Sequence, residues 1–235
     1  MAIEGLVNTR DLGGLPLRNG GETPYGVFFR GENVDHLSPH AWEELQRLGI
    51  RTVVDLRRVD ERESDTGSRP AWITTVSVDL DALEQEAFWA RYWHNKLVYT
   101  ALYYLPYLQE IPQRAAMALE AIASAEPGGV LFHCMAGRDR TGMVAMLLLA
   151  AANVEPEAIV DDYMESVRRG EIRALARGTA NDEPWIEDFC KSLGTSTEGA
   201  FRSAISGLDL DAMLDHSVTS IDTRVAIRTW RGTIA

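Results

Sequence analysis

Short runs of β-branched and aromatic residues alternate with longer helical stretches along the first two thirds of the chain. Bounded runs of this kind are typical of buried strands. They lie at 27–30, 51–56, 73–78 and 129–132. The longer stretches between them predict helices at 39–48, 84–109, 113–124 and 141–152. The last stretch is almost wholly apolar, which predicts a buried helix.

The last third of the chain predicts helices and no strand. Their ranges are about 156–169, 183–193, 197–206 and 218–229. Strands that alternate with helices predict an α/β fold, in which a mostly parallel central sheet is flanked by helices. We therefore expect a single domain over 1–235, with a core at about 4–170 and a helical C-terminal part at about 171–235.

The composition is that of a soluble globular protein and excludes a disordered, collagen-like or coiled-coil chain. Of the 235 residues, 46% are hydrophobic and 25% are charged. Lys and Arg number 23 against 35 Asp and Glu, and a net charge of −12 makes nucleic acids and anionic membranes unexpected partners. The longest apolar run, 143–152, is too short for a membrane span. No leader is visible around Glu4, which predicts a cytoplasmic protein and leaves leaderless export open.

The strongest chemical signal lies between the last predicted strand and the buried helix. Here a strand ends, residues 134–140 turn, and a helix begins. Backbone N–H groups in such a turn converge, and the helix N-terminus adds partial positive charge. Gly137 allows a tight or left-handed backbone, and the Arg140 guanidinium can donate two hydrogen bonds to one oxyanion. We therefore expect a phosphate-sized cradle with the Cys134 sulfur at its floor, and we call residues 134–140 the phosphate loop.

The residue types in the phosphate loop predict nucleophilic catalysis. A helix N-terminus and a nearby arginine stabilise the thiolate form of cysteine, so Cys134 can attack phosphorus and form a phosphocysteine that water hydrolyses. The Thr141 hydroxyl can hydrogen-bond the sulfur, and His133 is expected to brace the loop from behind. The residues expected to hold the phosphate are Met135, Ala136, Gly137, Arg138, Asp139 and Arg140.

The loop resembles the cysteine-dependent protein tyrosine phosphatase superfamily, whose mark is Cys-x5-Arg. The stretch from His133 to Gly142 is similar to the His-Cys-x-Ala-Gly-Lys-Asp-Arg-Thr-Gly motif of the bacterial tyrosine/serine phosphatase family, with Arg138 in place of the lysine. Further blocks resemble this family at 8–14, 29–38, 55–61 and 162–166, so the resemblance covers about 4–170. It implies a protein tyrosine phosphatase-like fold and cofactor-free, metal-free hydrolysis of phosphate esters. The implied partners are a phosphate ion in the loop and a phosphorylated protein or phospholipid as substrate.

A leaving alkoxide or phenoxide needs a proton donor, and three residues stay open for this role. Asp79 and Asp81 follow a buried strand, and loops at strand ends line the crevice of such sheets. The resemblance also implies an acid in this loop, and we favour Asp79. Asp139 lies inside the phosphate loop and is the third candidate.

Polar residues near other strand ends are predicted to surround the phosphate loop and hold it in place. They are Asn8, Arg10, Asp11, Arg30, Asp55, Arg57, Asp81 and His133. Surface charge and turn formation are the alternative explanation for them. The arginines at 168, 169, 173 and 177 could contact an acidic substrate or form a solvated helix face.

Two other functions remain open. Asp79 and Asp81 resemble the Asp-x-Asp of magnesium-dependent haloacid dehalogenase-type phosphatases, although Leu83 stands where that motif expects Thr or Val. A non-catalytic phosphate-binding module would use the same cradle without turnover. The aromatic residues between 88 and 107 could form a wall that grips a phenyl ring, or they could pack in the core.

Overall fold

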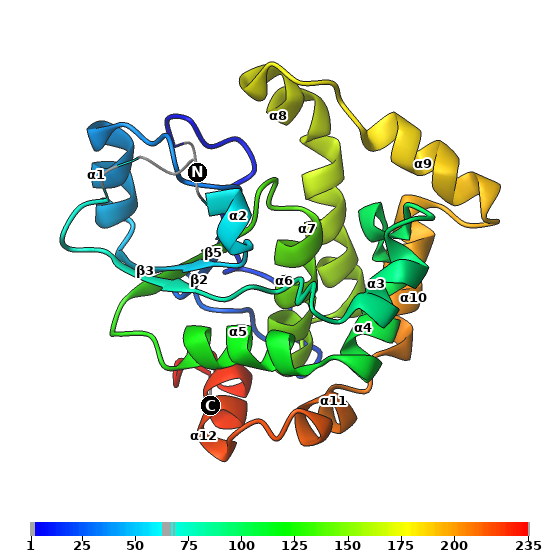
Figure 1. The fold of residues 1–235 in the computed structure, drawn as a ribbon. Helices are drawn as coiled ribbons and strands as arrows, with labels where there is room; N and C mark the ends of the chain where they lie inside the picture. Colours follow the sequence, from blue (N-terminus) through cyan, green and yellow to red (C-terminus); the bar gives the residue numbers. More distant parts are fainter. Residues whose placement is uncertain (1–2, 63–66, 68, 235) are drawn as a thin grey trace.

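A five-stranded sheet lies at the centre of the computed structural model, which describes residues 3–62, 67 and 69–234 (Figure 1). In spatial order its strands are β1 (Arg10–Asp11), β2 (Phe28–Gly31), β5 (Gly129–His133), β3 (Ile50–Asp55) and β4 (Thr74–Ser77). The pairs β2–β5, β5–β3 and β3–β4 are parallel, whereas β1 runs antiparallel to β2. The predicted α/β fold with a mostly parallel sheet is confirmed, and β1 is an additional edge strand that the pattern did not reveal.

The sheet separates two apolar cores because successive side chains of a strand point to opposite faces. Phe29, Val53 and Leu131 pack on one face with α1 (Pro39–Arg47). Phe28 and Val54 point into the larger core on the other face. That larger core also holds α5 (Gln113–Ala123), α6 (Asp139–Ala151) and α7 (Pro156–Arg168), and α6 is buried along almost its whole length, as its apolar sequence predicts.

The stretch predicted as one helix over 84–109 is broken into four pieces. They are α3 (Glu86–Tyr92), two short 3-10 turns η1 (Leu97–Tyr99) and η2 (Ala101–Tyr103), and α4 (Tyr104–Glu110). Lys96 adopts a left-handed backbone with φ of 64°, and Thr100 is extended and caps the next turn through its hydroxyl. These two residues end the helical path, and the aromatic residues then pack in several directions at once.

The remaining helices were predicted with shifted ends or were not predicted separately. The predicted ones are α9 (Glu183–Ser192), α10 (Thr197–Gly207) and α12 (Ile221–Arg228), and the additional ones are α2 (Val59–Arg62), α8 (Gly170–Arg177) and α11 (Leu210–His216). None of the described helices combines the length and the apolar character needed to cross a membrane.

The C-terminal helices share the larger core with the sheet. Trp230, just after α12, is fully buried, and its ring meets Phe28 of β2 edge-on with centroids 4.5 Å apart. Its indole N–H donates to the Pro24 carbonyl at 3.1 Å. In α7, the Tyr163 ring stacks on Phe201 of α10 at 3.9 Å. These contacts join the C-terminal helices to the larger core, and a single domain over 1–235 stays our prediction.

Trp230→Ala should lower the free energy of unfolding by about 3–5 kcal/mol, because the change empties a large volume next to Phe28. Urea denaturation followed by circular dichroism measures this change. Val225→Ala on the exposed side of α12 is the control and should stay within about 0.5 kcal/mol of the unmodified protein. Equal stability of the two variants would show that the C-terminal end contributes little to the core.

Candidate active site

The phosphate loop connects the end of β5 to the start of α6. Cys134 follows β5 directly and is 3% exposed, and α6 begins at Asp139. Gly137 has φ of 69°, and a Cβ built there would lie 2.5 Å from the backbone carbonyl of Gly31 in β2. Only glycine fits this position, because a side chain would be strained by the backbone conformation and would collide with the neighbouring strand.

The backbone carbonyls of the phosphate loop are bound from outside. The Asn8 side-chain amide donates to the carbonyls of Ala136 and Gly137 at 3.0 and 3.2 Å. Arg30 Nη2 donates to the Gly137 carbonyl at 2.9 Å. In a trans peptide the carbonyl and the following N–H point in opposite directions. The N–H groups that follow these carbonyls therefore point inward, as an anion cradle requires.

Two buried carboxylates hold the residues that bind these carbonyls. Glu32 accepts hydrogen bonds from the Asn8 backbone N–H at 2.8 and 3.0 Å. Asp162 on α7 accepts from Arg10 Nε at 2.7 Å and from Arg30 Nη1 at 2.5 Å. Burial disfavours the charged form of Asp162, but the two arginines outweigh it and lower the pKa of this carboxyl group. The ion pairs therefore keep both arginines in place.

A second buried cluster lies under the start of the phosphate loop. His133 Nδ1 lies 3.1 Å from the Cys134 carbonyl and can donate to it. Burial lowers the pKa of His133, so the ring is neutral at pH 7. Arg57 pairs with Asp55 at 2.8 Å and with Asp35 at 2.7 Å. His133 therefore lies behind the loop, as expected, and Asp55 and Arg57 fix the end of the adjacent strand.

Asp11 does not lie at the phosphate loop, although it was predicted to help hold it. Its carboxylate accepts from the backbone N–H groups of Gly13 and Gly26, each at 2.8 Å. Arg10 and Asp11 are consecutive residues of β1, so their side chains point to opposite sides. Arg10 therefore faces the site, and Asp11 closes a turn on the other side.

Arg140 lies in the first turn of α6, where two carboxylates hold its guanidinium. Its Nη1 and Nη2 donate to Glu61 at 2.5 and 2.7 Å, and Nη1 also lies 3.0 Å from Asp81. In the described part of the chain, its Nε–H has no hydrogen-bond partner. Thr141 is the next residue, and its buried hydroxyl has no partner among the described residues.

A pocket of about 280 Å³ opens beside Arg140. Acidic side chains, aromatic side chains and Arg140 itself line it. The acidic and aromatic residues include Asp81, Asp139, Trp93, Tyr99 and Tyr103. Trp93 and Tyr99 are 42% and 48% exposed and form its outer rim. The pocket therefore combines the Arg140 guanidinium with partly exposed aromatic side chains.

The structure distinguishes between the two aspartates that follow β4. Asp81 lines the pocket, and burial raises the pKa of its carboxyl group. The Trp89 indole N–H donates to the Asp81 carbonyl at 2.6 Å and fixes its backbone. Asp79 instead accepts from the N–H groups of Asp81 and Ala82 at 3.0 and 3.3 Å and is not among the residues that line the pocket. The geometry therefore favours Asp81 over Asp79, which the sequence had favoured.

Arg138 does not place its guanidinium as predicted for a phosphate-binding residue. Its Nε donates to Glu183 at 2.9 Å, and its Nη1 donates to the Tyr99 carbonyl at 3.0 Å and to Asp139 at 2.5 Å. The side chain is 2% exposed. The backbone of Arg138 belongs to the loop, but most of its side-chain donors are used elsewhere.

Some residues of the site gave only an indirect signal in the sequence. Glu61, Asp162 and Ser166 appeared as parts of family-like blocks, without a role for each. Arg177 of α8 donates to the Met135 carbonyl at 2.5 Å, so the arginine run in this region is partly a support of the loop. A contact from so distant a part of the chain leaves no local pattern that could reveal it.

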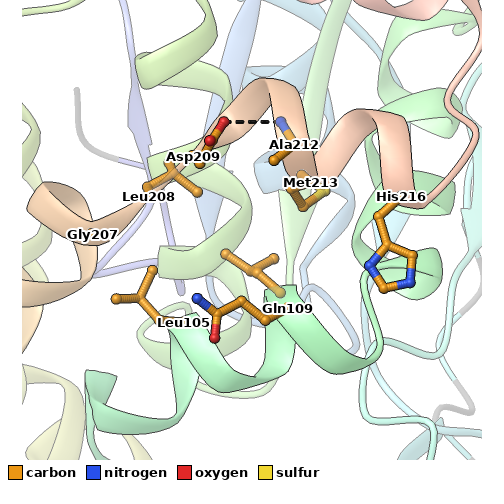
Figure 2. A pocket seen from close by; sticks show the side chains of 9 residues that line it. Leu105, Gln109, Gly207, Leu208, Asp209, Ala212, Met213 and His216 are labelled. Carbon is orange, nitrogen blue, oxygen red and sulfur yellow. Dashed lines mark hydrogen bonds between the residues drawn. The ribbon is translucent and has the colours of Figure 1, made fainter.

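A second pocket, shown in Figure 2, lies between α4 and α11. Its volume is about 320 Å³, and Leu105, Gln109, Met213 and His216 are among the residues that line it. Asp209 also lines this pocket, but its carboxylate accepts from the Ala212 N–H at 2.9 Å and caps α11. No residue of the phosphate loop lines this pocket, whereas Asp139 and Arg140 of the loop line the pocket beside Arg140.

Comparison with known proteins identifies the family of the chain. Residues 1–213 match the model of the tyrosine phosphatase family, and the chain therefore belongs to that family. It is 32% identical over 174 residues to a protein of Cupriavidus necator assigned as a tyrosine-protein phosphatase, covering 72% of this chain and 63% of the relative. It is 29% identical over 157 residues to the tyrosine-protein phosphatase of Nostoc commune, covering 60% and 48%. The match thus spans less than two thirds of either relative.

A solved structure also shows a likeness to the chain. The crystal structure of TpbA from P. aeruginosa in complex with phosphotyrosine matches with a TM-score of 0.37 and 17% identity. That match covers 83% of this chain and 87% of TpbA.

Gly137→Ala should weaken phosphate binding strongly and destabilise the fold. The left-handed backbone alone costs about 1–2 kcal/mol, and the collision with Gly31 adds to this cost. Isothermal titration with inorganic phosphate and urea denaturation measure the two effects. Gly178→Ala is a matched control, because Gly178 has φ of 63° but open space around its Cα. If the two variants behaved alike, close packing of the loop on β2 would not matter.

Proposed function

We propose that this chain is a cysteine-dependent phosphatase that hydrolyses phosphotyrosine without a metal ion. One observation carries the proposal: Cys134 and Arg140 flank a loop whose carbonyls are bound from outside by Asn8 and Arg30. Such a loop presents inward N–H groups, a helix N-terminus and a guanidinium to one oxyanion. The family match and the names of the relatives support a phosphate ester as substrate.

In the first step, the Cys134 thiolate attacks phosphorus, the S–P bond forms and the P–O ester bond breaks. Arg140 and the loop N–H groups stabilise the negative charge on the three non-transferred oxygens. Asp81 gives its proton to the leaving oxygen. In the second step, a water gives a proton to Asp81 and attacks phosphorus, the S–P bond breaks and phosphate leaves. The Thr141 hydroxyl donates to the departing sulfur.

The electrostatics of Asp81 suit the role of acid. Burial raises the pKa of its carboxyl group, although Arg140 and Arg58 oppose this effect. A raised pKa keeps more of the carboxyl group protonated, and only the protonated form can donate to the leaving group. Asp139 lies in the same pocket, but its carboxylate accepts a hydrogen bond from Arg138 Nη1 at 2.5 Å.

The rim of the pocket supports an aryl ester as substrate. Trp93 and Tyr99 line the pocket next to Arg140 and are partly exposed, so a phenyl ring could contact their side chains. Phosphoserine, phosphothreonine and phosphoinositide substrates belong to the same proposal as weaker substrates, since the cradle binds only the phosphate group. A panel of phosphopeptides and inositol phospholipids would rank them.

Cys134→Ser should abolish turnover of phosphotyrosine peptides and leave phosphate binding largely intact, because a hydroxyl is a far poorer nucleophile than a thiolate at neutral pH. Phosphate release and phosphate binding measure the two properties. Cys190→Ala is the control, because Cys190 is buried in α9 and does not belong to the phosphate loop. More than a few per cent of residual activity would contradict the cysteine mechanism. Loss of the unmodified protein's activity to a chelator, with rescue by magnesium, would favour the aspartate-dependent alternative.

Asp81→Asn should slow the hydrolysis of phosphotyrosine peptides by about 10²–10⁴-fold, the usual contribution of a general acid. It should slow an activated aryl phosphate much less, since that leaving group departs as an anion. In the unmodified protein the rate should fall as pH rises through the raised pKa of Asp81, because the acid then loses its proton. The variant should lack this fall.

Asp79→Asn is the control for this experiment, since Asp79 only closes the turn before Asp81. Rates at a series of pH values, with both substrates, compare the two variants. A loss that depends on the leaving group for Asp79→Asn, and not for Asp81→Asn, would transfer the role to Asp79.

A further inference from the structure

The Arg138 side chain connects the phosphate loop to two distant segments. Its Nε lies 2.9 and 2.8 Å from the two carboxylate oxygens of Glu183, the first residue of α9. Its Nη1 donates to the Tyr99 carbonyl at 3.0 Å, at the end of η1. Its guanidinium also lies over the Tyr163 ring, 5.6 Å from the centroid. One planar cation therefore fixes the positions of the loop, η1 and α9 relative to one another.

Glu183 is itself held by two residues that are near it in the sequence, Arg173 and Asn181. Its carboxylate accepts from Arg173 Nη2 at 2.9 Å, and its backbone N–H donates to the Asn181 side chain at 3.1 Å. It is 7% exposed. A buried carboxylate with two cationic partners is held firmly, because breaking either ion pair would leave a buried charge with less compensation.

A contact between two aromatic rings at the surface forms a second connection between η1 and α9. Tyr99 meets Trp185 of α9 edge-on, with ring centroids 5.7 Å apart. Trp185 stacks in turn on Phe189 with centroids also 5.7 Å apart, and the Lys96 ammonium lies 5.3 Å from its ring. The backbone of Tyr99 is thus fixed by Arg138 and its ring by Trp185. Tyr99 lines the pocket beside Arg140, so both contacts determine where the pocket rim lies.

Glu183 is not among the residues that line the pocket, yet its carboxylate holds the Arg138 side chain. We propose that Glu183 and Trp185 of α9 are positioning residues that act through Arg138 and Tyr99. They hold the Tyr99 ring where it contacts the phenyl ring of a substrate, and they thereby select aryl over alkyl phosphate esters. The inference rests on the proposed phosphatase function.

The experiment compares kcat and KM for a phosphotyrosine peptide and for a phosphoserine peptide of otherwise identical sequence. The ratio of kcat/KM for the two peptides measures selection by the rim and is independent of the amount of active protein. Trp185→Ala should lower this ratio by about 3–10-fold, as expected for the loss of one aromatic contact, mainly through a higher KM for phosphotyrosine. Trp185 is 41% exposed, so the variant should fold normally.

Arg138→Lys and Glu183→Gln test the buried contacts that join Glu183, Arg138 and the Tyr99 carbonyl. Lysine keeps the positive charge but cannot donate to Glu183 and Tyr99 in the same planar geometry. Glutamine keeps the shape of Glu183 and one acceptor oxygen. Each change should lower the ratio as Trp185→Ala does, and the double variant should show less than the sum of the two effects, because both remove the same contact.

Leu193→Ala at the exposed end of α9 is the control and should leave the ratio unchanged. An unchanged ratio in Trp185→Ala, or an equal loss of kcat on both peptides in Trp185→Ala and Arg138→Lys, would overturn the inference. The same holds if the unmodified protein shows no preference between the peptides. An unmodified protein that hydrolyses neither peptide would overturn the proposed function, and this inference with it.

Discussion

The arrangement of the site depends on the hydrogen bonds that bind the loop carbonyls from outside. Asn8 and Arg30 turn the carbonyls of Ala136 and Gly137 away from Cys134. Without these donors the loop carbonyls could turn inward, and their partial negative charges would repel an anion. Asp162 matters for the same reason, because it holds Arg30 directly and, through Arg10, also orients the Asn8 side chain. The proposed chemistry thus depends first on the orientation of these peptide groups.

The net charge of the protein repels an anion, whereas the groups at its site are expected to attract one. A net charge of −12 gives no general attraction for a phosphate dianion. Glu61, Asp81 and Asp139 add further negative charge around the pocket, and all three are paired with arginines. These ion pairs keep Arg140 in a fixed orientation while leaving its Nε–H without a partner in the described structure. Attraction for an anion therefore has to come from donors in and beside the loop, where burial strengthens each electrostatic interaction.

The sequence predicted those features that depend on neighbours along the chain. The α/β pattern, the buried helix α6 and the phosphate loop follow from periodicity, from Gly137 and from the spacing of Cys134 and Arg140. Features that depend on tertiary contacts could not be predicted in this way. The sequence favoured Asp79 over Asp81, whereas in the structure the Trp89 indole binds the Asp81 carbonyl and Asp81 lines the pocket. The role of Arg138 likewise depends on Glu183, which lies 45 positions further along the chain.

The separation of these contacts along the chain also bears on how the protein is made. Asn8 binds a carbonyl 128 positions away, and Arg10 binds a carboxylate 152 positions away. During synthesis the chain emerges at roughly 5–20 residues per second, N-terminal part first. The Cys134 segment therefore leaves the ribosome before Asp162 and Glu183 can fix its surroundings. Contacts of such long range also form slowly, because their loops must close first. The nascent chain thus carries Cys134 for a time without the contacts that hold its loop in the folded protein.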